Sequence, residues 1–207
     1  MKKIKKVLSF AMSMSLVFGL VACGGQTSSG GSNNVLKVQI DVEVASMDPQ
    51  IATDGTSFEV LAAVTEGLYS VDADGSPILA IADSVNKSTD GLTYEFKLKD
   101  AKWSNGSAVT ANDFVFAWKR LVDPATASEY SFIAGIAGIK NASEISAGNL
   151  PVEDLGVKAL DEKTLVVELS TPVPFFESLM AFPSFLPVNE EFYLEAGDSF
   201  ATTPDTI

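Results

Sequence analysis

The hydrophobic pattern changes period several times along residues 36–189, and this constrains the fold more than any other feature. Apolar and polar residues alternate over 36–43 and again over 94–99, a period of two that predicts strands with one buried face. From residue 56, and again from residue 110, apolar residues recur at helical spacing. Because strands and helices mix without a regular repeat, we expect an α/β fold with a mixed sheet.

Start and stop signals define the predicted helices. The first is expected to end at Gly67, a residue suited to a C-terminal cap. The second begins at Thr110, which with Asp113 forms a sequence close to a capping box, with Asp in place of Glu. Its apolar run extends to Val122, and Pro124 ends it.

Turn signals and shorter apolar runs complete the prediction. The Asp-Gly dipeptides at 74–75 and 90–91 predict turns. Residues 157–160 and 165–169 predict two short strands around a turn, and residues 175–180 predict a short helix that follows two prolines.

Several conspicuous side chains are interpreted as structural. Trp118 lies on the apolar stripe of its helix and Trp103 follows a strand, so we expect both to pack in the core. Lys119 and Arg120 are expected to be solvated charges that complement the helix dipole. The adjacent acids at 190–191 point apart on a helix, and no companion group supports catalysis by them.

The composition excludes several chemistries. The 207 residues contain no His and one Cys. No Ser-His-Asp triad, Cys-His pair or His-ligated zinc can therefore be built from them, and neither can an internal disulfide or a CxxC site. With 46% hydrophobic and 20% charged residues, the chain has enough apolar material for a packed core.

The chain is strongly acidic. Its formal net charge is −13, and without the four lysines of residues 1–6 ten basic residues face 27 acidic ones, a net charge of −17. Such a surface repels phosphate backbones, and no basic stripe overrides it, so nucleic acid is not an expected partner.

The N-terminus has the pattern of a lipoprotein leader. Residues 1–6 are basic and residues 7–22 are uncharged and mostly apolar, which is typical of a secretory signal peptide, since a spanning helix needs about 20 apolar residues. The only cysteine, Cys23, follows small residues in a way that resembles the bacterial lipobox. That resemblance implies cleavage after Ala22 and a lipid on the Cys23 thiol; an ordinary signal peptide with an incidental cysteine is the alternative.

Residues 24–34 (GGQTSSGGSNN) have no charge and no aliphatic side chain, so we expect a flexible tether spanning roughly 18 Å. Membrane attachment would then be by the lipid alone, made durable by two or more acyl chains. The expected location is the extracytoplasmic face of the cell membrane, at the cell surface or in the periplasm.

Seven short motifs occur in a characteristic order. They are Ser46–Pro49 (SMDP), Glu66–Tyr69 (EGLY), Asp100–Gly106 (DAKWSNG), Val109–Val115 (VTAxDFV), Trp118–Arg120 (WKR), Asp123–Tyr130 (DPxTASxY) and Leu155–Ala159 (LGVKA). This ordered set resembles the oligopeptide-binding proteins of bacterial ABC importers, the extracellular solute-binding protein family 5. The resemblance implies a two-lobed, type II periplasmic-binding-protein-like α/β fold, with mixed sheets and flanking helices.

The same resemblance implies a domain plan in which this chain is the N-terminal portion of a longer protein. We expect a lipoprotein signal peptide over 1–22 and a lipidated cysteine with its tether over 23–34. The first lobe would start at 35–65. A small additional α/β domain would occupy 66–189, and 190–207 would return into the first lobe.

The resemblance also points to ligand-binding residues. Tyr130 matches a tyrosine that lines the peptide cleft of the family, and a phenol offers an apolar face with one hydroxyl. Thr53, Asp54 and Gly55 align with a cleft-edge stretch, where Gly55 would let a peptide backbone approach closely. A packed or rim tyrosine, and an ordinary helix-entry turn capped by Asp54 or Thr56, are the alternatives.

The leading functional hypothesis is a monomeric binding protein, not an enzyme, that needs no cofactor or metal. It would capture oligopeptides largely through their main chain and deliver them to an ABC permease with its ATPase. The rival is a lipid-anchored extracellular hydrolase that uses carboxylates, for example a glycosidase. A third possibility, within the family, is a binder specialised for a signalling peptide or a metal complex.

Overall fold

The computed structural model describes residues 37–40 and 42–206. The chain divides into two units, residues 1–39 and 40–207, and the second holds every described helix and strand. The predicted signal peptide and tether, with Cys23, lie outside the described residues.

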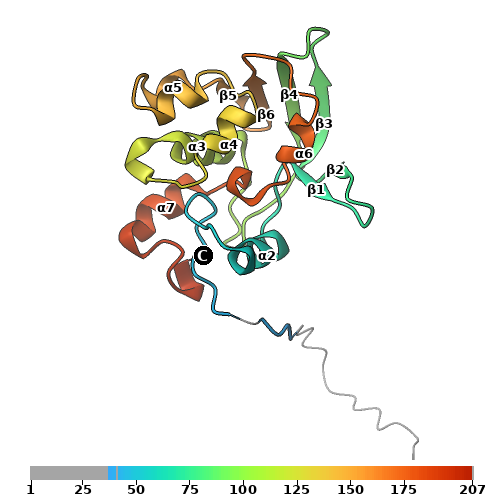
Figure 1. The fold of residues 1–207 in the computed structure, drawn as a ribbon. Coiled ribbons are helices and arrows are strands. Elements are labelled where there is room, and N and C mark those ends of the chain that lie inside the picture. Colours follow the sequence, from blue (N-terminus) through green and yellow to red (C-terminus); the bar gives the residue numbers. More distant parts are fainter. Residues whose placement is uncertain (1–36, 41, 207) are drawn as a thin grey trace, which may run out of the picture. The chain divides into compact units, whose positions relative to one another are not determined.

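The strands of this unit form two antiparallel sheets (Figure 1). The smaller sheet pairs β1 (Tyr69–Val71) with β2 (Pro77–Leu79). The larger sheet has the order β3-β4-β6-β5, and its strands are β3 (Ala82–Lys87), β4 (Thr93–Leu98), β5 (Val157–Asp161) and β6 (Thr164–Glu168).

The predicted turns join neighbouring strands. Gly75 and Gly91, with φ of 82° and 71°, lie in the connections from β1 to β2 and from β3 to β4. All pairs in the two sheets are antiparallel, whereas we expected mixed directions. The reason is that short turns join three of the pairs, and a parallel pair would need a long crossover.

The described residues also form α-helices. They are α2 (Gly55–Val64), α3 (Ala111–Val122), α4 (Phe132–Ile136), α5 (Ala142–Ser146), α6 (Phe176–Leu179) and α7 (Glu190–Ala196). Helix α3 packs on β5 and β6, and α4 and α5 lie against α3 (Figure 1).

The main core lies between α3 and the central strands. In the β4–β6 register Tyr94 pairs with Val167 and Phe96 with Leu165, and all four side chains are fully buried. On α3, the buried residues repeat at helical spacing as predicted, and Trp118 is only 1% exposed. The inner faces of β4 and β6, with a period of two, and the buried face of α3, with a period of 3.6, therefore form one apolar layer.

The capping signals of α3 are confirmed. The helix follows Thr110, whose backbone N–H donates to the Asp113 carboxylate at 2.8 Å, and it ends at Val122 before Pro124. Asp113 also accepts a hydrogen bond from the Trp103 indole N–H at 3.1 Å. Burial nevertheless raises the pKa of Asp113, because desolvation outweighs these hydrogen bonds.

Two predicted elements differ from the structure. Residues 37–40 and 42–43 form no strand, and Ile40 and Val42 stay 42% and 60% exposed, because no described strand pairs with this segment. Helix α2 ends at Val64, earlier than the predicted end at Gly67. Gly67 instead packs closely, since a Cβ there would lie 3.2 Å from the Met180 carbonyl oxygen.

A smaller apolar cluster lies beside the main core. Leu61 of α2, Ala52 and Leu186 are buried together, with Met47 and Phe58 packed against them. The segment 183–188 carries Leu186, and Phe185 of the same segment accepts a hydrogen bond from the Trp118 indole N–H at 2.9 Å. This segment therefore connects α2 to α3.

Candidate functional site

The turn at Thr53, Asp54 and Gly55 starts helix α2. Asp54 has an extended backbone, and its carboxylate accepts hydrogen bonds from the Ser57 N–H at 2.9 Å and the Ser57 hydroxyl at 2.6 Å. These two bonds hold the pKa of Asp54 below its usual value. The helix-entry alternative is thus correct as a description of the local structure.

The turn also leaves open space for another molecule. Thr53 and Gly55 are exposed, and a Cβ placed on Gly55 would meet nothing within 4 Å. The backbone at Gly55 is therefore accessible, and it sits in the first turn of a ten-residue helix, where backbone N–H groups lack helical partners.

Tyr130 belongs to an aromatic cluster formed with Phe58, Phe132 and Phe182. Its ring centroid lies 5.4 Å from Phe58, 5.6 Å from Phe132 and 5.4 Å from Phe182. Phe132 is stacked at 28° and is 55% exposed, whereas Phe58 meets Tyr130 edge to face. Within the described residues the Tyr130 hydroxyl has no hydrogen-bond partner, so it is available to a ligand.

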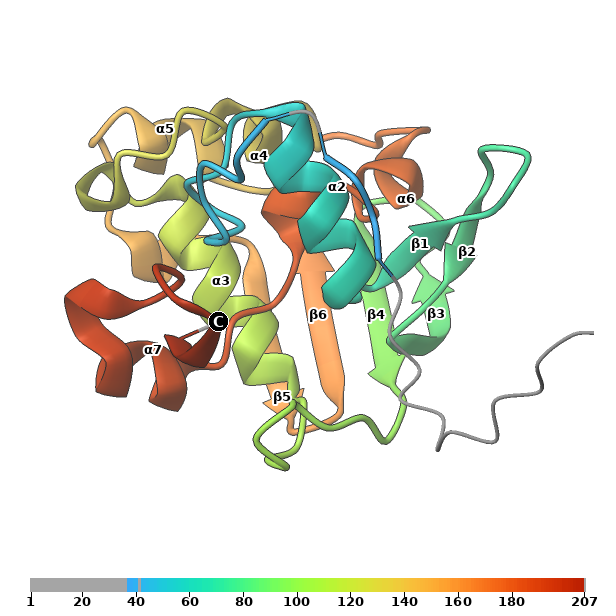
Figure 2. The ribbon, with the colours of Figure 1, turned by 90° about the horizontal axis from the view of Figure 1, so that it is seen from below.

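Phe58 brings the two predicted parts of the site together. It lies in the first half of α2, and its backbone N–H donates to the Asp54 carbonyl oxygen at 3.1 Å. Because its ring contacts Tyr130, the entry turn of α2 and the segment leading into α4 lie side by side (Figure 2). The sequence motifs did not identify Phe58, Phe132 or Phe182 as site residues; clustering of aromatic residues near Tyr130 was the only available signal.

Arg120 differs from its prediction. Its side chain is 10% exposed and is not a solvated charge. The guanidinium donates to both carboxylate oxygens of Asp48, at 2.6 and 3.2 Å, and to the Gln50 side-chain oxygen at 2.8 Å. The physical reason is that α3 ends beside the SMDP motif, which supplies a carboxylate to the inner face of the helix.

The two tryptophans are structural, as predicted. Trp118 is buried in the main core, and Trp103 packs partly buried against it. The acids Glu190 and Glu191 lie in the exposed first turn of α7, where the N-terminal cap is Asn189.

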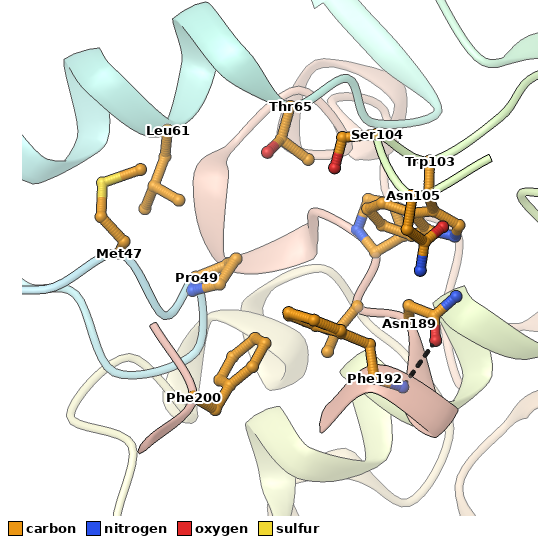
Figure 3. A pocket seen from close by; sticks show the side chains of 12 residues that line it. Met47, Pro49, Leu61, Thr65, Trp103, Ser104, Asn105, Asn189, Phe192 and Phe200 are labelled. Atoms are coloured by element: carbon orange, nitrogen blue, oxygen red, sulfur yellow. Dashed lines mark hydrogen bonds between the residues drawn. The ribbon is translucent and has the colours of Figure 1, made fainter. Parts of the chain in front are cut away.

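A mainly apolar pocket lies close to the SMDP motif (Figure 3). Met47, Pro49 and Leu61 form one side, and Phe192 and Phe200 form the facing side. None of the predicted ligand-binding residues lines this pocket, so it is distinct from the turn and aromatic cluster described above.

The described residues contain no helix long and apolar enough to cross a membrane. In the same part of the chain, no group of three or more His, Cys, Asp or Glu residues is arranged to hold a metal ion.

An open helix-entry turn beside an aromatic cluster that includes a phenol is suited to holding a ligand by main-chain and apolar contacts. The α/β fold and this arrangement suit a protein of the solute-binding class. The chain belongs to the bacterial extracellular solute-binding proteins, family 5, because the family model for the middle region matches residues 76–206.

Relatives and solved structures agree with this assignment. The dipeptide-binding protein of Lactococcus lactis is 40% identical over 99% of this chain and 36% of its own length. The substrate-binding domain of an oligopeptide ABC transporter from Bacillus anthracis is 52% identical, with a TM-score of 0.77 over 79% of this chain and 32% of that one. OppA of Listeria monocytogenes bound to peptide is 44% identical, with a TM-score of 0.76 over 78% of this chain and 32% of that one.

These matches confirm the predicted family and the periplasmic-binding-protein-like α/β fold class. They favour a binding protein over the hydrolase, since the family consists of solute-binding proteins. The chain spans about a third of the length of the relatives it matches.

Proposed function

We propose that this chain is part of a lipid-anchored binding protein that captures oligopeptides outside the cytoplasm and delivers them to an ABC import permease. The 207 residues would supply one wall of the ligand cleft, and a second lobe would supply the other. The relatives include dipeptide- and oligopeptide-binding proteins, which supports a peptide ligand.

The observation that carries the proposal is the meeting of two motif-derived segments at Phe58. The turn Thr53–Gly55 and Tyr130 are far apart in the sequence. Tyr130 packs against the Phe58 ring, and the Phe58 backbone N–H donates to the carbonyl oxygen of Asp54 in the turn. A purely structural role for each motif would not require their convergence on a partly exposed aromatic cluster.

The geometry suggests how a peptide would be held. Its main chain would approach the open backbone at Gly55 and hydrogen-bond there, as an added extended segment does. The Tyr130 hydroxyl would bond a main-chain group, while the exposed Phe132 ring would offer an apolar surface. Contacts of this kind depend little on the peptide sequence. Closure of a second lobe would bury the ligand.

The anchor is proposed from the sequence alone. A lipid on Cys23, followed by the tether at 24–34, would keep the folded unit near the membrane that holds the permease. No contact in the described residues favours a binder specialised for a signalling peptide or for a metal complex.

The Tyr130 hydroxyl provides a direct test in the complete protein. Because the ring packs against three aromatic neighbours, Tyr130→Phe keeps the packing and removes only the hydroxyl. We expect its affinity to fall by a similar factor for every peptide, about three- to tenfold, which corresponds to the roughly 0.5–1.5 kcal/mol of one hydrogen bond.

The measurement is calorimetry with three unrelated peptides of equal length, together with the unfolding temperature of the unliganded protein. An unchanged unfolding temperature with a uniform loss of affinity supports a main-chain contact. Unchanged affinity for all three peptides would remove Tyr130 from the site, and a changed ranking among them would assign it to a side-chain pocket.

A further inference from the structure

Among the ion pairs of the described residues, that of Arg120 with Asp48 is the most enclosed, with side chains 10% and 11% exposed. Besides its bonds to Asp48 and Gln50, its guanidinium carbon lies 4.2 Å from the centre of the Tyr193 ring and 5.7 Å from that of Phe200. The planar group is thus held from one side by carboxylate and amide oxygens and covered by aromatic rings, an arrangement that arginine suits and lysine does not.

Asp48 in turn fixes the backbone of residues 50–52 through hydrogen bonds. Its carbonyl oxygen accepts hydrogen bonds from the Ile51 N–H at 3.1 Å and the Ala52 N–H at 2.9 Å. Its carboxylate also accepts the Gln50 N–H at 3.0 Å. Ala52, which is 2% exposed, then packs against Leu61 immediately before Thr53.

The same loop is held at two more points. The Gln50 side-chain amide donates to the carbonyl oxygens of Ser184 and Leu186, at 3.3 and 3.2 Å. The buried Ser57 hydroxyl accepts hydrogen bonds from the N–H groups of Ala45 and Ser46, at 3.2 and 3.1 Å. The loop 45–52 is therefore fixed at both ends by buried polar groups, and Arg120 neutralises its one buried carboxylate.

The Asp48 side chain is only 11% exposed, and loss of Arg120 would remove its cationic partner. A buried charge that has lost its partner is strongly unfavourable, so the loop has to move until water reaches the carboxylate. Because Thr53 follows Ala52 directly, such a movement displaces the turn that starts α2.

We propose that Arg120 is a positioning residue for ligand binding, which acts through Asp48 to hold the turn Thr53–Gly55 in its binding conformation. This inference rests on the proposed function of that turn. It assigns to the WKR and SMDP motifs a joint role that neither motif shows alone.

The test uses Arg120→Met and Arg120→Lys in the complete protein, with Val122→Ala as the control. Val122 is on the same helix and fully buried, but it belongs to the main core and not to the loop. The control therefore loses stability without releasing Asp48. Peptide affinity is measured by calorimetry well below the unfolding temperature of each variant, and hydrogen–deuterium exchange of residues 48–54 is measured without ligand.

We expect Arg120→Met to weaken peptide binding about tenfold and to accelerate exchange in residues 48–54, with a smaller effect for Arg120→Lys. Val122→Ala should lower the unfolding temperature but change neither affinity nor exchange in this segment. The double variant of Arg120→Met with Asp48→Asn should bind no more weakly than Arg120→Met alone, since both substitutions break the same ion pair.

The proposal is overturned if Arg120→Met behaves like Val122→Ala, with a lower unfolding temperature and unchanged affinity. It is also overturned if exchange in residues 48–54 is unaffected. If the wild-type protein binds no peptide, the proposed function fails, while the exchange experiment still decides whether Arg120 orders the turn.

Discussion

Under the proposed function, a side chain at Gly55 would interfere directly with an approaching peptide backbone. Alanine fits the first turn of α2 without strain, because Gly55 is exposed and has open space around it. We therefore expect Gly55→Ala to leave stability unchanged or raise it by up to about 1 kcal/mol, yet to weaken peptide affinity in the complete protein. Calorimetry and thermal unfolding measure the two effects separately.

Gly148→Ala is a useful contrast. Gly148 also has open space, but its φ of 75° is costly for alanine. This control should lose stability and keep its affinity, the opposite of Gly55→Ala. Equal affinity of Gly55→Ala and wild type would show that no ligand backbone comes close to this turn.

The sequence predicted single residues well where their partners are close in the chain. The capping roles of Asp54 and of Thr110 with Asp113 involve residues three positions apart, and the structure has these contacts. Arg120 was predicted wrongly because its partner Asp48 is distant in sequence and packing alone brings the two together. The same reason explains why Phe182 was not identified as a neighbour of Tyr130.

At the scale of elements, Glu168 forms two ion pairs at the end of β6. On β6 it lies 3.1 Å from the Lys140 ammonium and 3.3 Å from that of Lys158 on β5. The hydrogen bonds from Lys140 and then Lys158 hold its pKa below the ordinary value of 4.5. A carboxyl with a lowered folded-state pKa stabilises the fold above its unfolded pKa and loses that effect as the pH falls through the folded value.

Glu168→Gln should therefore be less stable than wild type at pH 7, by no more than about 1 kcal/mol because both ion pairs are exposed. The difference should shrink below pH 4.5 and disappear at lower pH. Urea unfolding between pH 3 and 7 measures it, with Glu129→Gln as the control, since Glu129 is exposed and forms no ion pair with a described residue. A difference independent of pH would exclude the ion pairs as its cause.

Elements were predictable where the local pattern agreed with the packing around it. The alternation in 94–99 gave β4 because β3 and β6 flank that strand on both sides. The alternation in 36–43 is equally clear, yet its described residues form no strand, since alternation specifies a face and not a neighbour. The direction of strand pairing depends on connections that periodicity does not encode.

At the scale of the whole molecule, the proposed anchor depends on one functional group, the Cys23 thiol. Replacing Cys23 with Ser removes the only thiol of the chain, so no lipid can be attached there. We expect Cys23→Ser to leave the membrane fraction for the medium or the periplasm, as shown by fractionation and immunoblotting. Unchanged retention in the membrane fraction would contradict the anchor.

The expected cleft, the expected second lobe and the domain boundaries at 65 and 189 could not be derived from residue patterns, because a local pattern encodes single elements and not the division of a chain into domains. The family resemblance supplied them as expectations. The match to the family over residues 76–206 confirms the membership, and the boundaries stay predictions.

The most direct test of the central claim is native mass spectrometry of the complete protein purified from its host. The account predicts a fraction carrying one bound mass that fragments as an intact peptide, and a weaker retention of that mass by Tyr130→Phe. Bound species that are not peptides, or turnover of added peptide into fragments, would contradict capture of oligopeptides without chemistry.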